Sequence, residues 1–234
     1  LKTGILSGKL IRFMIHPVAG YARRQQLRFL FAPMILALDF ETANGDAGSI
    51  CSVGIASLGG GGEIEREEIL IRPHDSCSRF SCFNVMIHGI RPDMVRNAPK
   101  WSDIWPRIAG RFAGNVVAAH NAAFDIGAFR RVMELYELPL PEFPYFCTCK
   151  LARRLWPGLE NHRLNTLCDY LGFRFEHHQA GEDAAAAAFI VRRMLETTGA
   201  ADWRELLEKL RINPGLVSPR GCVGCRVVPK GKSR

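Results

Sequence analysis

Two features are missing from this sequence, and each absence excludes a class of protein. No apolar run approaches the roughly 18 residues that a membrane-spanning helix needs, so no membrane contact is expected. Nothing resembles a secretory signal, so the eight cysteines are expected to be reduced thiols in the cytosol and not a disulfide framework. With 234 residues and 47% apolar content, the chain is long enough for one well-packed core.

Acidic residues are also missing, but only from the two ends of the chain. Residues 1–33 and residues 211–234 each contain six basic residues and no acidic residue. Because the formal charge of the whole chain is +8, the segment 34–210 carries −4. The basic ends would add a salt-dependent attraction to phosphate backbones that ignores sequence, or they would be solubilising tails without a partner.

Two acidic residues are present where a charge is costly. Asp39 and Glu41 close the apolar run 34–38, which we expect to be a buried strand. Side chains two positions apart share one face of a strand, so the two carboxylates lie side by side. They repel each other unless a cation lies between them, and Mg²⁺ prefers such oxygen ligands. The alternative is a solvated strand end that enters a turn.

A second acidic position follows another short apolar strand. The segment 116–120 leads into Asn121, and Asp125 falls at the start of a helix expected over 126–136. The helix dipole favours a carboxylate at that point, and Asn121 is placed to orient neighbouring groups or to contact a substrate. The alternative is that both residues only form the turn and cap the helix.

A third acidic position begins an alanine-rich helix expected from Ala184 to about Thr197. Asp183 falls in the first turn of this helix, and His178 lies on the preceding loop, five residues earlier. The small alanine side chains predict that the helix packs closely on a sheet. His177 is adjacent to His178, and the spacing to Asp183 favours His178 as the functional residue.

The segments ALDFET, HNAAFD and HxxxxD, in this order, resemble the three motifs of the DEDDh 3′–5′ exonucleases. The secondary signatures IHGI at 87–90, LARR at 151–154 and NTL at 165–167 agree with this resemblance, which covers residues 34–198. The chain is most similar to the proofreading subunits of bacterial replicative polymerases and their stand-alone relatives. Phe40 stands where the proofreading subunits usually have threonine, which puts a replicative role in doubt and leaves the chemistry unaffected.

The resemblance implies a role for each matching residue. Asp39, Glu41, Asp125 and Asp183 match the four carboxylates that bind two divalent metal ions, Mg²⁺ with Mn²⁺ as a substitute. His178 matches the general base and completes the catalytic set. Ile87, His88 and Phe124 fall where relatives line the pocket for the terminal nucleotide. Thr42 and Asn121 are also expected to bind the substrate.

The resemblance also implies an RNase H-like α/β fold with a mixed five-stranded sheet, three antiparallel strands followed by two parallel ones, flanked by helices. Three domain segments are expected: a basic N-terminal extension (1–33), the exonuclease domain (34–198), and a C-terminal helix with a basic tail (199–234). The sequence predicts strands and helices at the following ranges: strands near 34–39, 50–58, 64–71 and 116–120, and helices near 102–113, 125–136, 148–155, 164–171, 183–197 and 203–210.

Three functions are compatible with these residues. The first is a 3′–5′ exonuclease that acts on DNA 3′ ends, preferably single-stranded, in repair or proofreading. The second is the same chemistry on RNA, as in the similar ribonuclease T and oligoribonuclease. The third is a catalytically silent nucleic-acid-binding module. The motifs do not separate DNA from RNA, because that choice depends on how the site treats the 2′-hydroxyl.

Partners and the two ends of the chain remain open at this point. The segment Gln26–Phe31 is faintly similar to the short motif that docks polymerase partners onto a bacterial sliding clamp, although residues 1–33 can also be an upstream extension that is not native. A polymerase partner and a homodimer are further alternatives. Cys222 and Cys225 form a lone CxxC, for which we expect a disordered tail in preference to a zinc site completed by Cys147 and Cys149.

Overall fold

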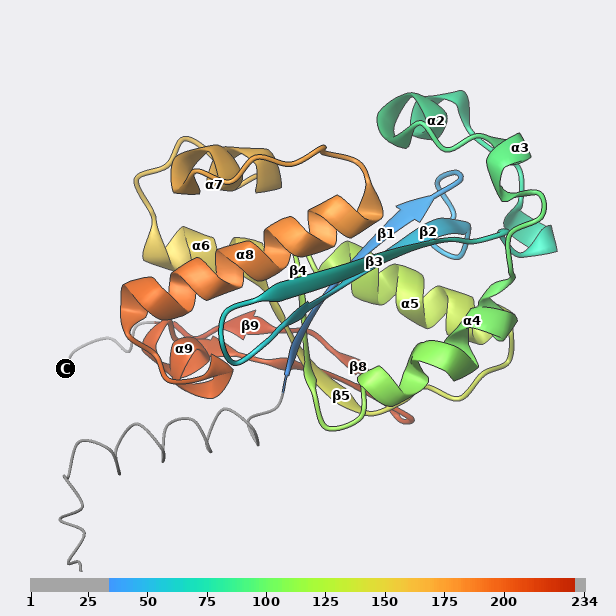
Figure 1. The fold of residues 1–234 in the computed structure, drawn as a ribbon. Coiled ribbons are helices and arrows are strands. Elements are labelled where there is room, and N and C mark those ends of the chain that lie inside the picture. The colour runs from blue at the N-terminus through green and yellow to red at the C-terminus, as the bar shows by residue number, and fades with distance from the viewer. Residues whose placement is uncertain (1–33, 230–234) are drawn as a thin grey trace, which may run out of the picture. The chain divides into compact units, whose positions relative to one another are not determined.

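The computed structural model describes residues 34–229, and Figure 1 shows their fold. A seven-stranded mixed sheet with the order β3-β2-β1-β4-β5-β7-β8 lies between two groups of helices. The expectations made for residues 1–33, including the clamp-binding motif, lie outside the described part of the chain. None of the helices within residues 34–229 is long and apolar enough to cross a membrane.

The first five strands have the arrangement that the sequence predicts. β1 pairs antiparallel with β2 and parallel with β4, β2 pairs antiparallel with β3, and β4 pairs parallel with β5. No residues were assigned to the fifth strand from the sequence, and the structure places it at 143–147. The strand bounds are β1 (Ile35–Thr42), β2 (Ile50–Leu58), β3 (Ile64–Leu70), β4 (Val116–Ala119) and β5 (Phe143–Cys147).

Helices cover both faces of the sheet, and each face has its own apolar core. One core joins the sheet to α6, α7, α8 and α9, and the other joins it to α4 and α5. The helix bounds are α2 (Cys82–His88), α3 (Pro92–Val95), α4 (Trp101–Ile108), α5 (Ala123–Leu135), α6 (Thr148–Leu155), α7 (Leu164–Leu171), α8 (Ala180–Thr198) and α9 (Trp203–Lys209), with short 3₁₀ turns η1 (Asp75–Cys77) and η2 (Ala109–Arg111).

Strand alternation decides which face each β1 side chain takes. Ile35 and Ala37 belong to the core under α8, whereas Leu38 and Phe40 belong to the core under α4 and α5. Asp39 and Glu41 continue the first series, so their carboxylates lie on the face that α8 covers. The prediction that these two residues share a face is confirmed by this register.

The alanine-rich helix α8 packs directly against β1, β2 and β3. Its five consecutive alanines, residues 184–188, are all buried, which lets the helix axis lie close to the sheet. The approach is closest at Gly54 in β2, where a Cβ atom would lie only 1.8 Å from the carbonyl oxygen of Ala180. Glycine at this position is therefore required for the first turn of α8 to reach the sheet.

The C-terminal segment differs from the prediction of a disordered tail. Residues 212–227 form four short strands, β6 (Ile212–Asn213), β7 (Gly215–Ser218), β8 (Gly221–Val223) and β9 (Arg226–Val227). β7 pairs antiparallel with β5 and extends the sheet, and Lys150 on α6 donates a hydrogen bond of 2.6 Å to the carbonyl of Cys225. Within the described residues, Cys147, Cys149, Cys222 and Cys225 form no group of three donor atoms close enough for a metal ion.

Candidate active site

Three of the four predicted carboxylates come from two elements that meet at one end of the sheet. Asp39 and Glu41 lie near the end of β1, and Asp183 lies in the first turn of α8. Each offers an oxygen atom, and the three oxygens lie within 4.8 Å of one another. A group of this kind matches the oxygen donors that Mg²⁺ or Mn²⁺ takes in proteins.

The fourth carboxylate, Asp125, reaches the same place from the other face of the sheet. It lies in the first turn of α5 and is only 1% exposed. Its Oδ1 accepts a hydrogen bond of 3.2 Å from the backbone N–H of Phe40, the residue between Asp39 and Glu41. Its Oδ2 is buried without a hydrogen-bond partner within residues 34–229. A buried acceptor without a partner is costly, and a cation or its bound water would satisfy it.

The electrostatics of the site point to the same conclusion. Burial, and then the negative charges of Asp125, Asp183 and Glu41, hold the pKa of Asp39 well above its usual range. Burial and neighbouring carboxylates raise the pKa of Glu41 to about 8, and burial also raises the pKa of Asp125. Asp39, Glu41 and Asp125 thus resist ionisation beside Asp183, and a divalent cation would stabilise their ionised forms, so the residues present fit such an ion.

Both histidines of the loop before α8 contact Asp183. The Nδ1 atom of His177 lies 2.9 and 3.1 Å from the two carboxylate oxygens of Asp183, and the backbone N–H of His178 donates to Oδ2 at 3.3 Å. The two imidazole rings stack with their centroids 3.9 Å apart. His178 has a φ of 71°, so the chain turns sharply here and directs both rings to the site. Burial, and then His177, lower the pKa of His178, which keeps it neutral and able to accept a proton.

The predicted substrate-binding residues do not all offer free groups. His88 is buried; its Nε2 contacts the carbonyl oxygen of Thr42 at 3.1 Å, and its Nδ1 accepts the N–H of Ile90. Both ring nitrogens of His88 are thus used to hold the end of β1. Ile87 and Phe124, in contrast, are 36% and 45% exposed, which leaves apolar surface available to a base.

Two residues that sequence reasoning missed hold α8 in position. Asp39, Gly54 and Glu68 lie side by side across three strands, in register on one face. One oxygen of Glu68 accepts from the hydroxyl of Ser52 at 2.8 Å, and the other accepts from the N–H of Gly181 at 3.3 Å. A glycine inside a strand was the available signal for Gly54. Glu68 is the last of four consecutive charged residues in β3, and this run gave no signal that distinguished it from the others.

His120, the first residue of the HNAAFD motif, is a third missed residue. Its Nε2 donates to the carbonyl of His162 at 3.0 Å, since a carbonyl can only accept, and its Nδ1 lies 2.9 Å from the hydroxyl of Thr148. Burial lowers the pKa of His120 to about 4, so the ring stays neutral. His162 in turn contacts the carbonyl of Trp156 at 3.0 Å. These bonds tie the loop between α6 and α7 to the end of β4.

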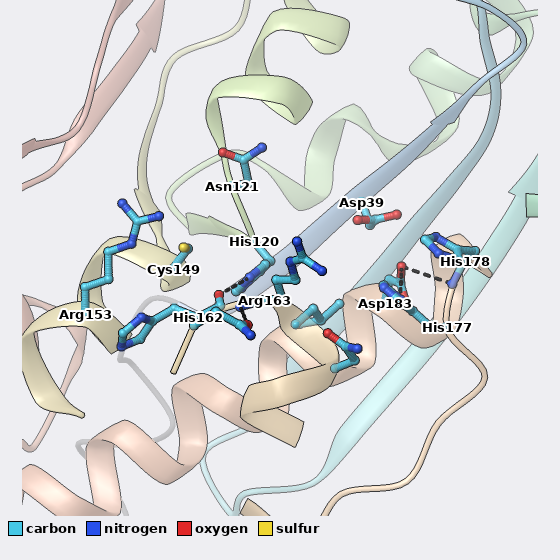
Figure 2. Close-up of a pocket in the computed structure, with 13 residues that line it drawn as sticks. Asp39, His120, Asn121, Cys149, Arg153, His162, Arg163, His177, His178 and Asp183 are labelled. Atoms are coloured by element: carbon cyan, nitrogen blue, oxygen red, sulfur yellow. Dashed lines mark hydrogen bonds and ion pairs between the residues drawn. The ribbon is translucent and has the colours of Figure 1, made fainter. Parts of the chain in front are cut away.

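A cavity of about 630 Å³ connects this loop with the carboxylates, as Figure 2 shows. Asn121, with a φ of 62°, lies at its edge together with Asp39, Asp183, His177 and His178. The rest of the wall comes from α6, from the loop after it and from the start of α7: Cys149, Arg153, Asn161, His162, Arg163, Leu164 and Asn165, with His120 between the two parts.

Comparison with known proteins agrees with this geometry. The family model described as Exonuclease (RNase T) matches residues 36–191. DNA polymerase III PolC-type from Oceanobacillus iheyensis is 30% identical over 172 residues, and that from Bacillus subtilis is 30% identical over 176 residues. Each match covers 72% of this chain but only 12% of the relative, so the chain spans about one eighth of the length of these relatives.

Solved structures of exonucleases are also similar to this chain. Exonuclease X in complex with 5′ overhanging duplex DNA matches with a TM-score of 0.60 and 28% identity, over 76% of this chain and 99% of that one. The nuclease domain of 3′hExo, a DEDDh family member bound to rAMP, shares the fold with a TM-score of 0.61 and 18% identity, over 71% and 93% of the two chains. The prediction made from the three motifs is confirmed at the level of the family: the chain belongs to the Exonuclease (RNase T) family of DEDD exonucleases and has the RNase H-like fold.

Proposed function

We propose that this protein removes nucleotides one at a time from 3′ ends of DNA in repair or proofreading, and releases nucleoside 5′-monophosphates. The observation that carries the proposal is the meeting of Asp39, Glu41, Asp125 and Asp183 at one end of the sheet. There an oxygen of Asp125 is buried without a hydrogen-bond partner among the described residues. Such a group has no structural use as four bare carboxylates, because they repel and lose hydration.

The four carboxylates would hold two divalent ions, Mg²⁺ or Mn²⁺. Asp39, Glu41 and Asp183 would form one donor set, and Asp39 would contribute with Asp125 to a second. When bound, a pair of ions activates a water molecule and neutralises charge on the leaving oxygen of a phosphodiester. The chain itself supplies the fixed donor positions: β1 and α8 from one side of the sheet, α5 from the other.

His178 is the residue that we assign as the general base. One of its ring nitrogens lies within 4.8 Å of an Asp183 oxygen, and its lowered pKa leaves the ring neutral near pH 7. A neutral imidazole accepts the proton of the attacking water as the P–O3′ bond breaks. Ile87 and Phe124 would receive the terminal base on their exposed surfaces.

The choice of DNA rests on the relatives. The PolC-type relatives are named as DNA polymerases, and exonuclease X was solved with duplex DNA. A polymerase or sliding-clamp partner, and a homodimer, stay predictions.

The test uses a 5′-labelled single-stranded DNA oligonucleotide and an RNA of the same sequence, each with Mg²⁺, Mn²⁺ or EDTA. We expect a ladder that shortens from the 3′ end of the DNA, and that is lost in EDTA and in the Asp39→Asn variant. Faster shortening of the RNA would change the substrate class and keep the chemistry. Binding of the oligonucleotide in EDTA, without cleavage in Mg²⁺ or Mn²⁺, would mean that the protein is a nucleic-acid-binding module and not an enzyme.

A further inference from the structure

The cavity continues well beyond the carboxylates, and its far end is cationic. Figure 2 shows Arg153 at the end opposite Asp183, with Arg163 between them in this view. Arg153 comes from the last turn of α6 and Arg163 from the residue before α7, and both line the same 630 Å³ cavity. The site described above uses neither residue.

Among the residues that the structure describes, both guanidinium groups lack an acidic partner. Within residues 34–229, neither Arg153 nor Arg163 forms an ion pair, whereas Arg66, Arg111 and Arg131 are each paired with a carboxylate. Two arginines that line one cavity without a counter-ion are the arrangement in which guanidinium groups bind phosphate. The side chains of Asn161 and Asn165 line the same wall and add neutral hydrogen-bond donors.

The wall that carries these arginines is held in place before any ligand arrives. His120 bonds the carbonyl of His162, and the N–H of Arg163 donates to Oδ1 of Asn161 at 3.0 Å. Thr148, at the start of α6, contacts the same His120 ring. The helix that carries Arg153 and the loop that carries Arg163 are therefore both anchored to the end of β4, next to the catalytic strand β1. A preorganised wall loses little entropy when it binds.

The direction of the reaction decides which phosphates can reach these arginines. An exonuclease that acts from the 3′ end has one nucleotide beyond the scissile bond, and that nucleotide carries no further phosphate. Any additional phosphate in the same cavity must then belong to nucleotides on the 5′ side. The separation of opposite charges along the cavity keeps this phosphate away from the carboxylates.

We propose that Arg153 and Arg163 form a phosphate-binding subsite for the backbone on the 5′ side of the scissile bond. The inference rests on the proposed nuclease activity and deepens it: the preferred substrate is a single strand of at least three nucleotides, bound through its backbone without sequence preference. Loss of one such contact weakens binding about ten-fold, the usual effect of a charge-assisted hydrogen bond. It also makes the decrease of the logarithm of the binding constant with the logarithm of the salt concentration less steep, by about 0.7 per phosphate contact.

The experiment compares two substrates with the full chain. One is a DNA octanucleotide, and the other is the 5′-p-nitrophenyl ester of thymidine monophosphate, which has a scissile phosphate but no second phosphate. In the Arg153→Gln/Arg163→Gln variant we expect the KM for the octanucleotide to rise ten-fold or more, with kcat/KM for the ester unchanged. Arg107→Gln, which removes an exposed charge from α4 outside the cavity, is the matched control and is expected to leave both substrates unaffected.

Binding is measured separately, so that the subsite and the nuclease activity are tested independently. Fluorescence anisotropy of a labelled octanucleotide in EDTA, over a range of salt, is expected to show weaker binding and a smaller salt slope in the double variant. Equal KM and equal anisotropy for wild type and double variant would overturn the subsite. Failure of the wild type to hydrolyse either substrate would instead overturn the proposed function, and the anisotropy result would still decide on the arginines.

Discussion

At the scale of single residues, the two adjacent histidines have different geometry and should have different roles. The ring of His177 is hydrogen-bonded to Asp183, whereas within residues 34–229 His178 is hydrogen-bonded to it through its backbone N–H and not through its ring. We therefore expect His178→Ala to lower kcat by roughly 10²–10⁴-fold, the usual contribution of a general base. His177→Ala should change mainly the Mg²⁺ concentration needed for half-maximal rate, because it frees an Asp183 oxygen.

Steady-state kinetics at several Mg²⁺ concentrations separate the two effects. If His177→Ala lowers kcat more than His178→Ala does, the assignment of the base must be exchanged. The sequence favours His178 by its spacing to Asp183, and in the structure both histidines contact Asp183. The spacing along the chain carries no information about ring orientation, which here depends on the left-handed backbone at residue 178.

At the scale of elements, the catalytic geometry depends on the close approach of α8 to β2. In Gly54→Ala the new Cβ would lie 1.8 Å from the carbonyl oxygen of Ala180, so the first turn of α8 must move and take Asp183 with it. We expect a loss of activity of at least ten-fold and a stability loss of about 1–3 kcal/mol from overpacking. Activity assays and thermal unfolding measure the two effects.

The matched control is Gly127→Ala in α5, where a Cβ would meet nothing within 4 Å. Alanine is a better helix former than glycine, so the free energy of unfolding of this variant should increase by up to about 1 kcal/mol, and its activity should be unchanged. Full activity in Gly54→Ala would show that α8 tolerates displacement and that the glycine is not needed for the site.

The elements also show why some of the fold was predictable and some was not. An apolar run marks the strand that carries Asp39, and consecutive alanines mark the helix that carries Asp183. The ranges of both elements could therefore be predicted from the sequence. The strands within 212–227 are two to four residues long and mostly exposed, so they show no periodicity. They are held by long-range contacts such as the pairing of Tyr145 with Gly215, which local sequence does not encode.

At the scale of the whole molecule, the active site should reduce the stability of the metal-free fold at alkaline pH. Burial and neighbouring carboxylates raise the pKa of Glu41 from 4.5 to about 8, so the folded state keeps a proton that the unfolded state has released. In EDTA, the free energy of unfolding should therefore increase as the pH falls from about 8 to 6.5. Each retained proton contributes about 1.4 kcal/mol per pH unit within this window.

The lower limit of this window is set by His120, whose shift has the opposite sign. Burial lowers its pKa to about 4, so below about pH 6.5 the unfolded state gains a proton that the folded state refuses, and this offsets the further gain in stability from Glu41. The measurement is therefore the free energy of unfolding, determined by chemical denaturation in EDTA at pH 6.5 and at pH 8. Mg²⁺ added at pH 8 should restore stability, because it binds the ionised carboxylates of the folded state only.

The variant Glu41→Gln separates this effect from the rest of the chain, with Glu65→Gln on β3 as the control for loss of an exposed acidic residue. We expect Glu41→Gln to be more stable than the wild type at pH 8 in EDTA and to gain less stability from Mg²⁺. It should lose only part of the pH dependence between 6.5 and 8, because Asp39 and Asp125 keep their raised pKa values. The control should keep the pH dependence of the wild type. An unchanged pH profile in Glu41→Gln would mean that Glu41 is ionised in the metal-free fold, and that the carboxylates do not need a cation to coexist.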